Sequence, residues 1–142
     1  MNLKLLLVFV SCFFLTSCAS HEPNQELVKA HAQNNIAEIE NYIIEFNPSN
    51  ATLGTPTFSF FIKDKKTLQP LTILQKNHDK DIHLIIVSRT LQEFQHLHPA
   101  LNQEHWTANP FFSQQGDYKL WFEFSKDNKH YLTDFEFTIS SK

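Results

Sequence analysis

The chain has 142 residues and a formal net charge of −3, with 12 Lys and Arg, 15 Asp and Glu, and eight His. This length fits one domain with a single core and is too short for two. Nucleic-acid binding depends on a basic face, so the charge balance argues against nucleic acid as a partner.

Residues 1–17 have the pattern of a secretion signal, with Lys4 followed by an apolar run from Leu5 to Leu15. The run is shorter than the roughly 20 apolar residues of a membrane span, so we interpret it as a signal peptide. The following Leu15-Thr16-Ser17-Cys18 resembles the lipobox of bacterial lipoproteins, in which the cysteine carries a diacylglycerol. This resemblance implies a lipid anchor on Cys18 and a periplasm-facing place in the cell envelope. Ala19 after the cysteine implies the outer membrane. The alternatives are ordinary secretory cleavage that leaves a free thiol, and an uncleaved anchor.

Residues 18–36 are polar and contain few large apolar side chains. We predict that they are a flexible tether behind the lipidated cysteine, with one helical turn from Glu26 to Ala32. His21 and His31 lie in this segment, and we expect both imidazoles to be solvated.

Residues 37–142 show the two-residue periodicity of strands, and we predict one domain there. The expected strands are Glu38–Phe46, Thr57–Lys63, Leu71–Leu74, Ile82–Ser88, Phe94–His98, Asp117–Phe124 and Thr133–Ile139. Ile82–Ser88 is apolar almost throughout, as in a central strand that is covered on both faces. A single helical turn or bend is expected at Arg89–Glu93. About seven short strands predict an all-β fold, an immunoglobulin-like antiparallel β-sandwich, in which aromatic residues stabilise the core without a disulfide.

Sulfur ligands are excluded from the predicted domain. Cys12, Cys18 and Met1 are the only sulfur-containing residues, and all lie in the signal or at its end. A Cu(I) site built from soft sulfur ligands is therefore ruled out, whereas imidazole and carboxylate suit Cu(II), Zn(II) or Ni(II). We expect no organic cofactor.

The segment FQHLHPAL carries the clearest candidate site. Along a strand, His96 and His98 project from the same face, with their Cα atoms about 6.5 to 7 Å apart. His83 interrupts an apolar strand and is the best candidate for a third ligand. His78 is a further candidate, with Asp79 or Asp81 as an oxygen ligand or an orienting group. His105 is plausible but less constrained, and His130 is set aside.

Three functions remain open for this pattern. The first is a lipoprotein that binds Cu(II) or Zn(II) through His83, His96, His98 and His78, and that buffers the ion or delivers it to a partner in the envelope. The second is an adaptor whose histidines are structural. The third is a His-ligated metalloenzyme. The sequence has no HExxH, no GxSxG and no nucleophilic cysteine, so we do not expect an enzyme.

The stretch HLIIVSRTLQEFQHLHPAL resembles the signature of small secreted bacterial lipoproteins with an immunoglobulin-like fold. The matching positions are His83, Leu84, Val87, Ser88, Leu91, Phe94, His96, His98 and Pro99, followed by Phe111, Phe112, Gly116, Tyr118 and Leu120. Most members are uncharacterised, and many occur beside copper or heavy-metal functions of the envelope. The resemblance covers roughly residues 38–139 and implies a metal-handling role, with His83, His96 and His98 at the family's histidine positions. Arg89-Thr90 departs from the pattern, which has an acidic residue before Leu91, so a carboxylate role is not expected at that point.

Overall fold

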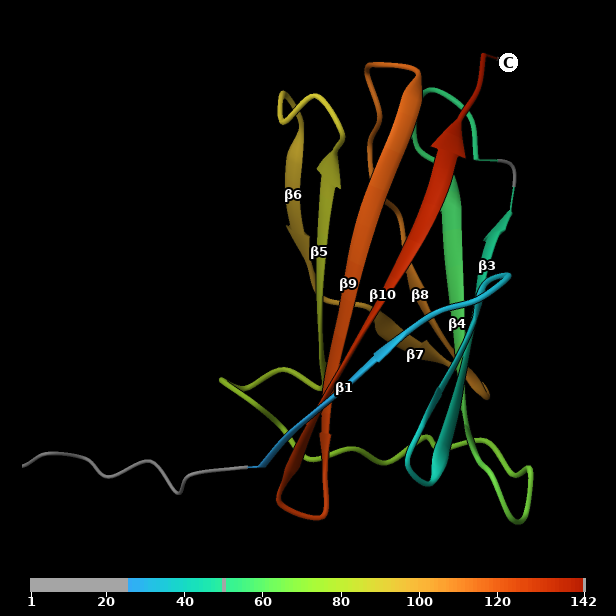
Figure 1. The fold of residues 1–142 in the computed structure, drawn as a ribbon, viewed down its shortest axis with the longest axis vertical. Helices are drawn as coiled ribbons and strands as arrows, with labels where there is room; N and C mark the ends of the chain where they lie inside the picture. The colour runs from blue at the N-terminus through green and yellow to red at the C-terminus, as the bar shows by residue number, and fades with distance from the viewer. Residues whose placement is uncertain (1–25, 50, 142) are drawn as a thin grey trace, which may run out of the picture.

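Alternating apolar side chains build two five-stranded sheets that pack face to face (Figure 1). The computed structural model describes residues 26–49 and 51–141. The first sheet has the order β1 (Glu26–His31), β10 (Lys129–Ile139), β9 (Gly116–Lys126), β5 (Ile82–Ser88) and β6 (Phe94–Leu97). The second has the order β2 (Ile36–Ile39), β3 (Tyr42–Ser49), β4 (Thr57–Asp64), β8 (His105–Ala108) and β7 (Ala100–Asn102). The predicted all-β sandwich is confirmed, with ten strands in the described residues.

The inner faces of the two sheets meet in an aromatic core. Phe60 on β4 stacks on Phe122 on β9, with ring centroids 4.7 Å apart. Phe46 on β3 lies 5.3 Å from Phe135 on β10. Both pairs join one sheet to the other, and burying one such side chain contributes about 1.5–3 kcal/mol. Aromatic packing therefore holds the two sheets together, as predicted.

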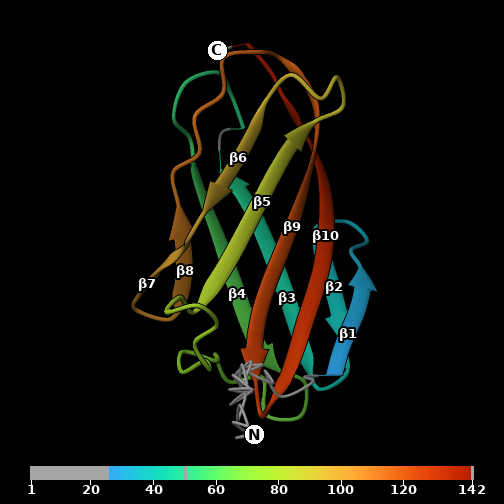
Figure 2. The same cartoon turned by 90° about the vertical axis from the view of Figure 1, so that its left-hand side faces the viewer.

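The segment before residue 37 corrects one prediction. Residues 26–31 form strand β1 and not a helical turn in a tether, and β1 pairs in parallel with β10. Val28, Ala30 and Ala32 are half-buried against the core, at a spacing of two residues. The sheet therefore begins within the predicted tether. The chain then crosses to β2 in the other sheet (Figure 2).

Three further predictions about strands were wrong in detail. The predicted strand Glu38–Phe46 is a hairpin of β2 and β3, which turns at Glu40 with φ of 44°. Leu71–Leu74 is not a strand, although Leu71 donates a backbone hydrogen bond to Ile62 over 2.7 Å. The sequence interpretation missed β7 and β8, which follow the His-Pro step at residues 98–99.

Strand β5 is covered on one face and partly open on the other. Its residues alternate between buried and half-buried, so the prediction of two covered faces was wrong. Ile82, Leu84 and Ile86 point into the core, whereas His83 points to the outer face of the first sheet. Within the described residues, no helix is long and apolar enough to cross a membrane.

Candidate metal centre

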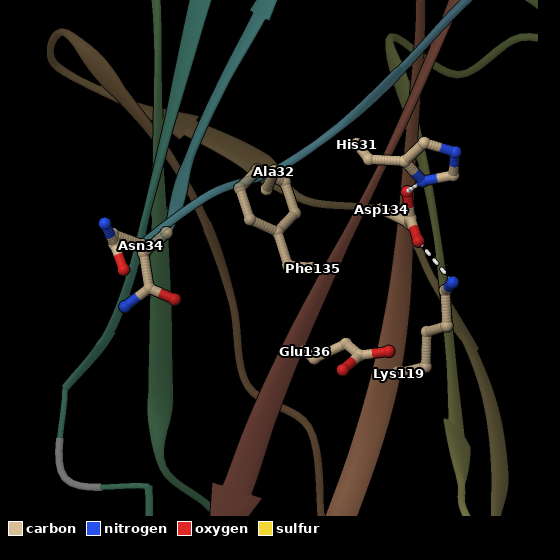
Figure 3. A pocket seen from close by; sticks show the side chains of 8 residues that line it. His31, Ala32, Asn34, Lys119, Asp134, Phe135 and Glu136 are labelled. Carbon is tan, nitrogen blue, oxygen red and sulfur yellow. Dashed lines mark hydrogen bonds and ion pairs between the residues drawn. The ribbon is translucent and has the colours of Figure 1, made fainter.

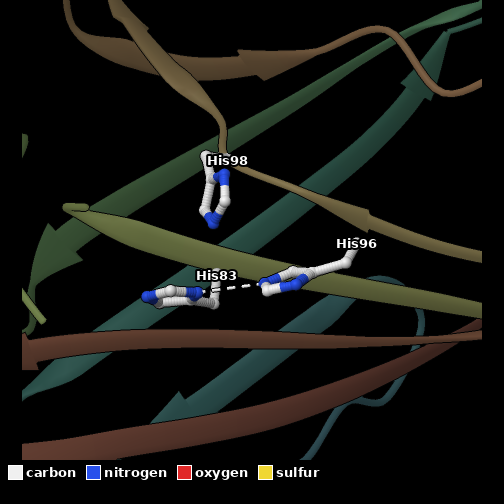
Figure 4. Close-up of side chains that lie close together, drawn as sticks. All are labelled: His83, His96 and His98. Atoms are coloured by element: carbon white, nitrogen blue, oxygen red, sulfur yellow. Dashed lines mark hydrogen bonds between the residues drawn. The ribbon is translucent and has the colours of Figure 1, made fainter. Parts of the chain in front are cut away.

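The hairpin of β5 and β6 places three histidines on the outer face of the first sheet, near its edge (Figure 4). In the antiparallel register Leu84 pairs with Leu97 and Ile85 pairs with His96. His98 follows one residue after the end of β6, which brings it level with His83. The buried Pro99 comes next, and its ring restricts the backbone directly after His96 and His98. The strand register therefore brings together residues that are 13 and 15 positions apart.

One nitrogen from each of His83, His96 and His98 lies within 4.8 Å of the other two. The ring centroids are 5.3 Å apart for His83 and His96, 4.9 Å for His83 and His98, and 4.8 Å for His96 and His98. Among residues 26–49 and 51–141, this is the one group of at least three His, Cys, Asp or Glu side chains with such a spacing.

The three rings are close to the geometry of a coordination site. Metal to nitrogen bonds of about 2.0–2.1 Å place the ligand atoms of a tetrahedral site roughly 3.4 Å apart. The widest nitrogen–nitrogen separation therefore needs to shrink by at most about 1.4 Å, which a rotation of the side chains can supply. Nδ1 of His83 and Nε2 of His96 are already 3.0 Å apart. His96 and His98 are exposed, so both have room to rotate.

His83 is hydrogen-bonded at both ring nitrogens. Its Nε2 lies 3.0 Å from the backbone carbonyl of Asn77, and its Nδ1 lies 3.0 Å from Nε2 of His96. A carbonyl oxygen only accepts, so in the neutral ring Nε2 carries the proton and Nδ1 is the acceptor. The lone pair of Nδ1 therefore points toward His96.

The surroundings of His98 favour a neutral ring. Partial desolvation lowers the pKa of His98 below its ordinary value, and electrostatic repulsion by its neighbours His83, His96 and Lys80 lowers it further. A neutral imidazole is the form that binds a metal ion. The electrostatics at His98 therefore favour coordination near neutral pH.

The fourth predicted ligand, His78, is not part of the group. It lies exposed in the tight turn from Asn77 to Lys80, with φ of 47°. Asp79 and Asp81 are also outside the group. The loop instead contributes the backbone carbonyl of Asn77, which is hydrogen-bonded to His83. The sequence could not indicate this group, because every residue has a backbone carbonyl.

The other described histidines have separate surroundings. His105 packs on the ring of Phe61 at 5.1 Å. His130 lies 2.9 Å from the hydroxyl of Ser125 and 3.5 Å from the carboxylate of Glu123. Cys18 and His21 lie outside the described residues, so the predicted lipidation stays a prediction.

His31 has a specific partner, although its side chain is 86% exposed. It pairs with the carboxylate of Asp134, which also pairs with Lys119, beside a hollow of about 430 Å³ (Figure 3). Burial raises the pKa of Asp134, but hydrogen bonds from Lys119 and His31 outweigh it and hold this pKa below its ordinary value. The His31 imidazole is solvated as expected, and the structure adds a partner on β10 that the sequence did not indicate.

The bend at the other end of the hairpin is a hydrogen-bonded corner. The hydroxyl of Ser88 accepts backbone hydrogen bonds from Gln92 and Glu93 over 3.1 and 3.0 Å. The carboxylate of Glu93 accepts from the backbone of Ser113 over 3.0 Å and from the hydroxyl of Tyr118. We define the corner by Ser88, Glu93, Ser113 and Tyr118. Two positions of the sequence signature, Ser88 and Tyr118, therefore have a structural role.

The comparisons with known proteins give one family and one solved structure. A family model described as Domain of unknown function (DUF8832) matches residues 37–141. The search of curated proteins found no match. A copper-bound variant of FetP from uropathogenic Escherichia coli has 13% sequence identity and a TM-score of 0.49, covering 78% of this chain and 93% of its own. Because the family model spans most of the sequence, this chain belongs to the family described as Domain of unknown function (DUF8832).

Proposed function

We propose that the domain binds one divalent ion, Cu(II) or Zn(II), through His83, His96 and His98. The observation that carries this proposal is the approach of three imidazole nitrogens to within 4.8 Å of one another. Imidazole is a good ligand for both ions, so the donor set does not distinguish between them. The bound ion replaces the hydrogen bond between His83 and His96, with His96 offering the lone pair of its Nε2 in the other tautomer.

The position of the site supports buffering or delivery of the ion, not turnover of a substrate. β6 is the edge strand of the first sheet; His96 is exposed on it, and His98 is exposed directly after it. An ion held there has its remaining coordination position toward solvent. A metal-handling partner can reach that position and exchange ligands with the site.

We further propose that the domain works in the bacterial cell envelope, facing the periplasm from a lipid anchor on Cys18 in the outer membrane. The support is the segment Leu15-Thr16-Ser17-Cys18 after an apolar run, together with Ala19 after the cysteine. The sequence signature, with its link to envelope metal handling, agrees with this location.

A calorimetric titration with Cu(II) and Zn(II) tests the proposal on the full chain in detergent micelles. We expect one ion per chain, and a loss of affinity of at least about 100-fold in a His96→Ala/His98→Ala variant that is shown to be folded. The matched control is His105→Ala, which removes an imidazole that packs on Phe61 outside the group. If the parent takes up no ion, or if the double variant binds as well as the parent, the proposal is wrong.

One observation favours a second candidate function, an adaptor with structural histidines. Both ring nitrogens of His83 already have partners within the chain, so this ring is satisfied without an ion. Under this alternative, the His96→Ala/His98→Ala variant loses thermal stability while the parent shows no metal-dependent change. Thermal unfolding with and without Zn(II) separates the two functions, because a bound ion stabilises the folded state.

A further inference from the structure

The turn before β5 holds His83 from the side opposite to the other two histidines. Residues Asn77 and Lys80 close this turn with backbone hydrogen bonds of 2.8 and 3.0 Å. The two residues between them have φ of 47° and 65°, as a tight hairpin turn requires. The carbonyl of Asn77 therefore has a fixed position from which it accepts a hydrogen bond from the Nε2–H of His83.

A carboxylate on the next strand holds this turn against the sheet. Glu123 on β9 is the register partner of His83, and its Oε1 accepts a hydrogen bond from the Asn77 side chain over 3.2 Å. The same oxygen lies 3.5 Å from Nδ1 of His130, which is in turn 2.9 Å from the Ser125 hydroxyl. The chain of contacts thus runs from His130 through Glu123 and Asn77 to His83.

We propose that Asn77 and Glu123 are positioning residues that make Nδ1 the metal-binding atom of His83. This inference rests on the proposed function. Nε2 is committed to the Asn77 carbonyl, so the lone pair that faces His96 and His98 is on Nδ1. Hydrogen-bond partners of this kind fix the tautomer and the orientation of a metal-binding imidazole, and their loss typically lowers metal affinity 10- to 100-fold.

The tautomer can be measured without any metal. In the full chain labelled with ¹⁵N-histidine in detergent micelles, long-range ¹H–¹⁵N correlation spectra distinguish a protonated Nε2 from a protonated Nδ1. The His83→Gln variant assigns the signals. We expect metal-free His83 to carry its proton on Nε2, and Zn(II) to shift Nδ1 and leave Nε2 protonated.

Variants of Glu123 test the positioning role. We expect Glu123→Ala to weaken Zn(II) binding about tenfold and to mix the two tautomers of His83. Glu123→Gln keeps an oxygen that accepts from Asn77, so its affinity should stay within about threefold of the parent. The matched control is Glu45→Ala, which removes an equal charge from β3 in the other sheet, where Glu45 pairs with Lys63.

The outcomes separate this inference from the proposed function. A proton on Nδ1 of metal-free His83, or coordination through Nε2, overturns the inference even if the ion binds tightly. Glu123→Ala with parental affinity and an unchanged His83 tautomer overturns the positioning role. A parent that binds neither Zn(II) nor Cu(II) overturns the proposed function and takes the inference with it.

Discussion

The two ends of the β5–β6 hairpin use polar side chains in opposite ways. At the corner, the hydrogen-bonding groups of Ser88, Glu93 and Tyr118 are directed at other groups of the chain. At the histidine end, the Nδ1 of His83 and the Nε2 of His96 share a hydrogen bond that an ion can replace. One hairpin can therefore carry both a structural corner and a candidate binding site, because the register of β5 and β6 fixes both ends at once.

The largest difference between the two ends, in their effects on stability and on metal affinity, should appear when the corner loses the hydroxyl of Tyr118. We expect Tyr118→Phe to lower the free energy of unfolding by about 2 kcal/mol, because the hydroxyl donates to the half-buried carboxylate of Glu93, which loses this partner. Zn(II) affinity should stay within about twofold of the parent, since the corner lies at the other end of β5. Urea unfolding and calorimetry measure the two quantities.

The control for this prediction is a variant that should lose metal affinity and keep its stability. A His98→Asn variant should lose metal affinity while its free energy of unfolding stays close to that of the parent, because His98 is exposed. If Tyr118→Phe weakened metal binding as much as His98→Asn does, the two ends would not be independent.

Acid should affect the two ends in different pH ranges. The pKa of His98 is lowered, so the native state binds fewer protons there than the unfolded chain, and its contribution to stability is lost as the pH falls below about 6.5. Protons also compete with the ion for the three imidazoles. We expect Zn(II) affinity to fall at least about tenfold between pH 7 and pH 5.5.

The corner should resist that change in pH. Burial raises the pKa of Glu93, but hydrogen bonds from Ser113, Tyr118 and the backbone of Gln114 outweigh it, so the net shift is downward. Stability from a carboxylate with a lowered pKa is lost only as the pH falls below about 4.5. Metal-free unfolding curves of the parent and of Glu93→Gln should therefore differ at pH 5.5 nearly as much as at pH 7. If the stability difference between the parent and Glu93→Gln vanished by pH 5.5, the lowered pKa of Glu93 would be wrong.

Local periodicity explains which parts of the molecule could be predicted from sequence. Large inward side chains alternate in β9 and β10, and a spacing of two residues places His96 and His98 on one face. Strand β1 could not be predicted this way, because its inward residues Val28 and Ala30 are small and its partner strand is about 100 residues away. The role of the Asn77 carbonyl could not be predicted from the sequence either, since any residue supplies a backbone carbonyl.

The smallest effect is expected at His78, the predicted ligand that the structure leaves outside the group. Its backbone has φ of 47°, so Asn is a suitable replacement because Asn tolerates the left-handed region and lacks an imidazole. We expect His78→Asn to change Zn(II) affinity less than about twofold, within the range of surface substitutions away from a site. The measurement is calorimetry beside His98→Asn, which makes the same chemical change inside the group. A large loss in His78→Asn would mean that the turn closes onto the ion and supplies a fourth nitrogen. The hairpin would then provide only part of the site.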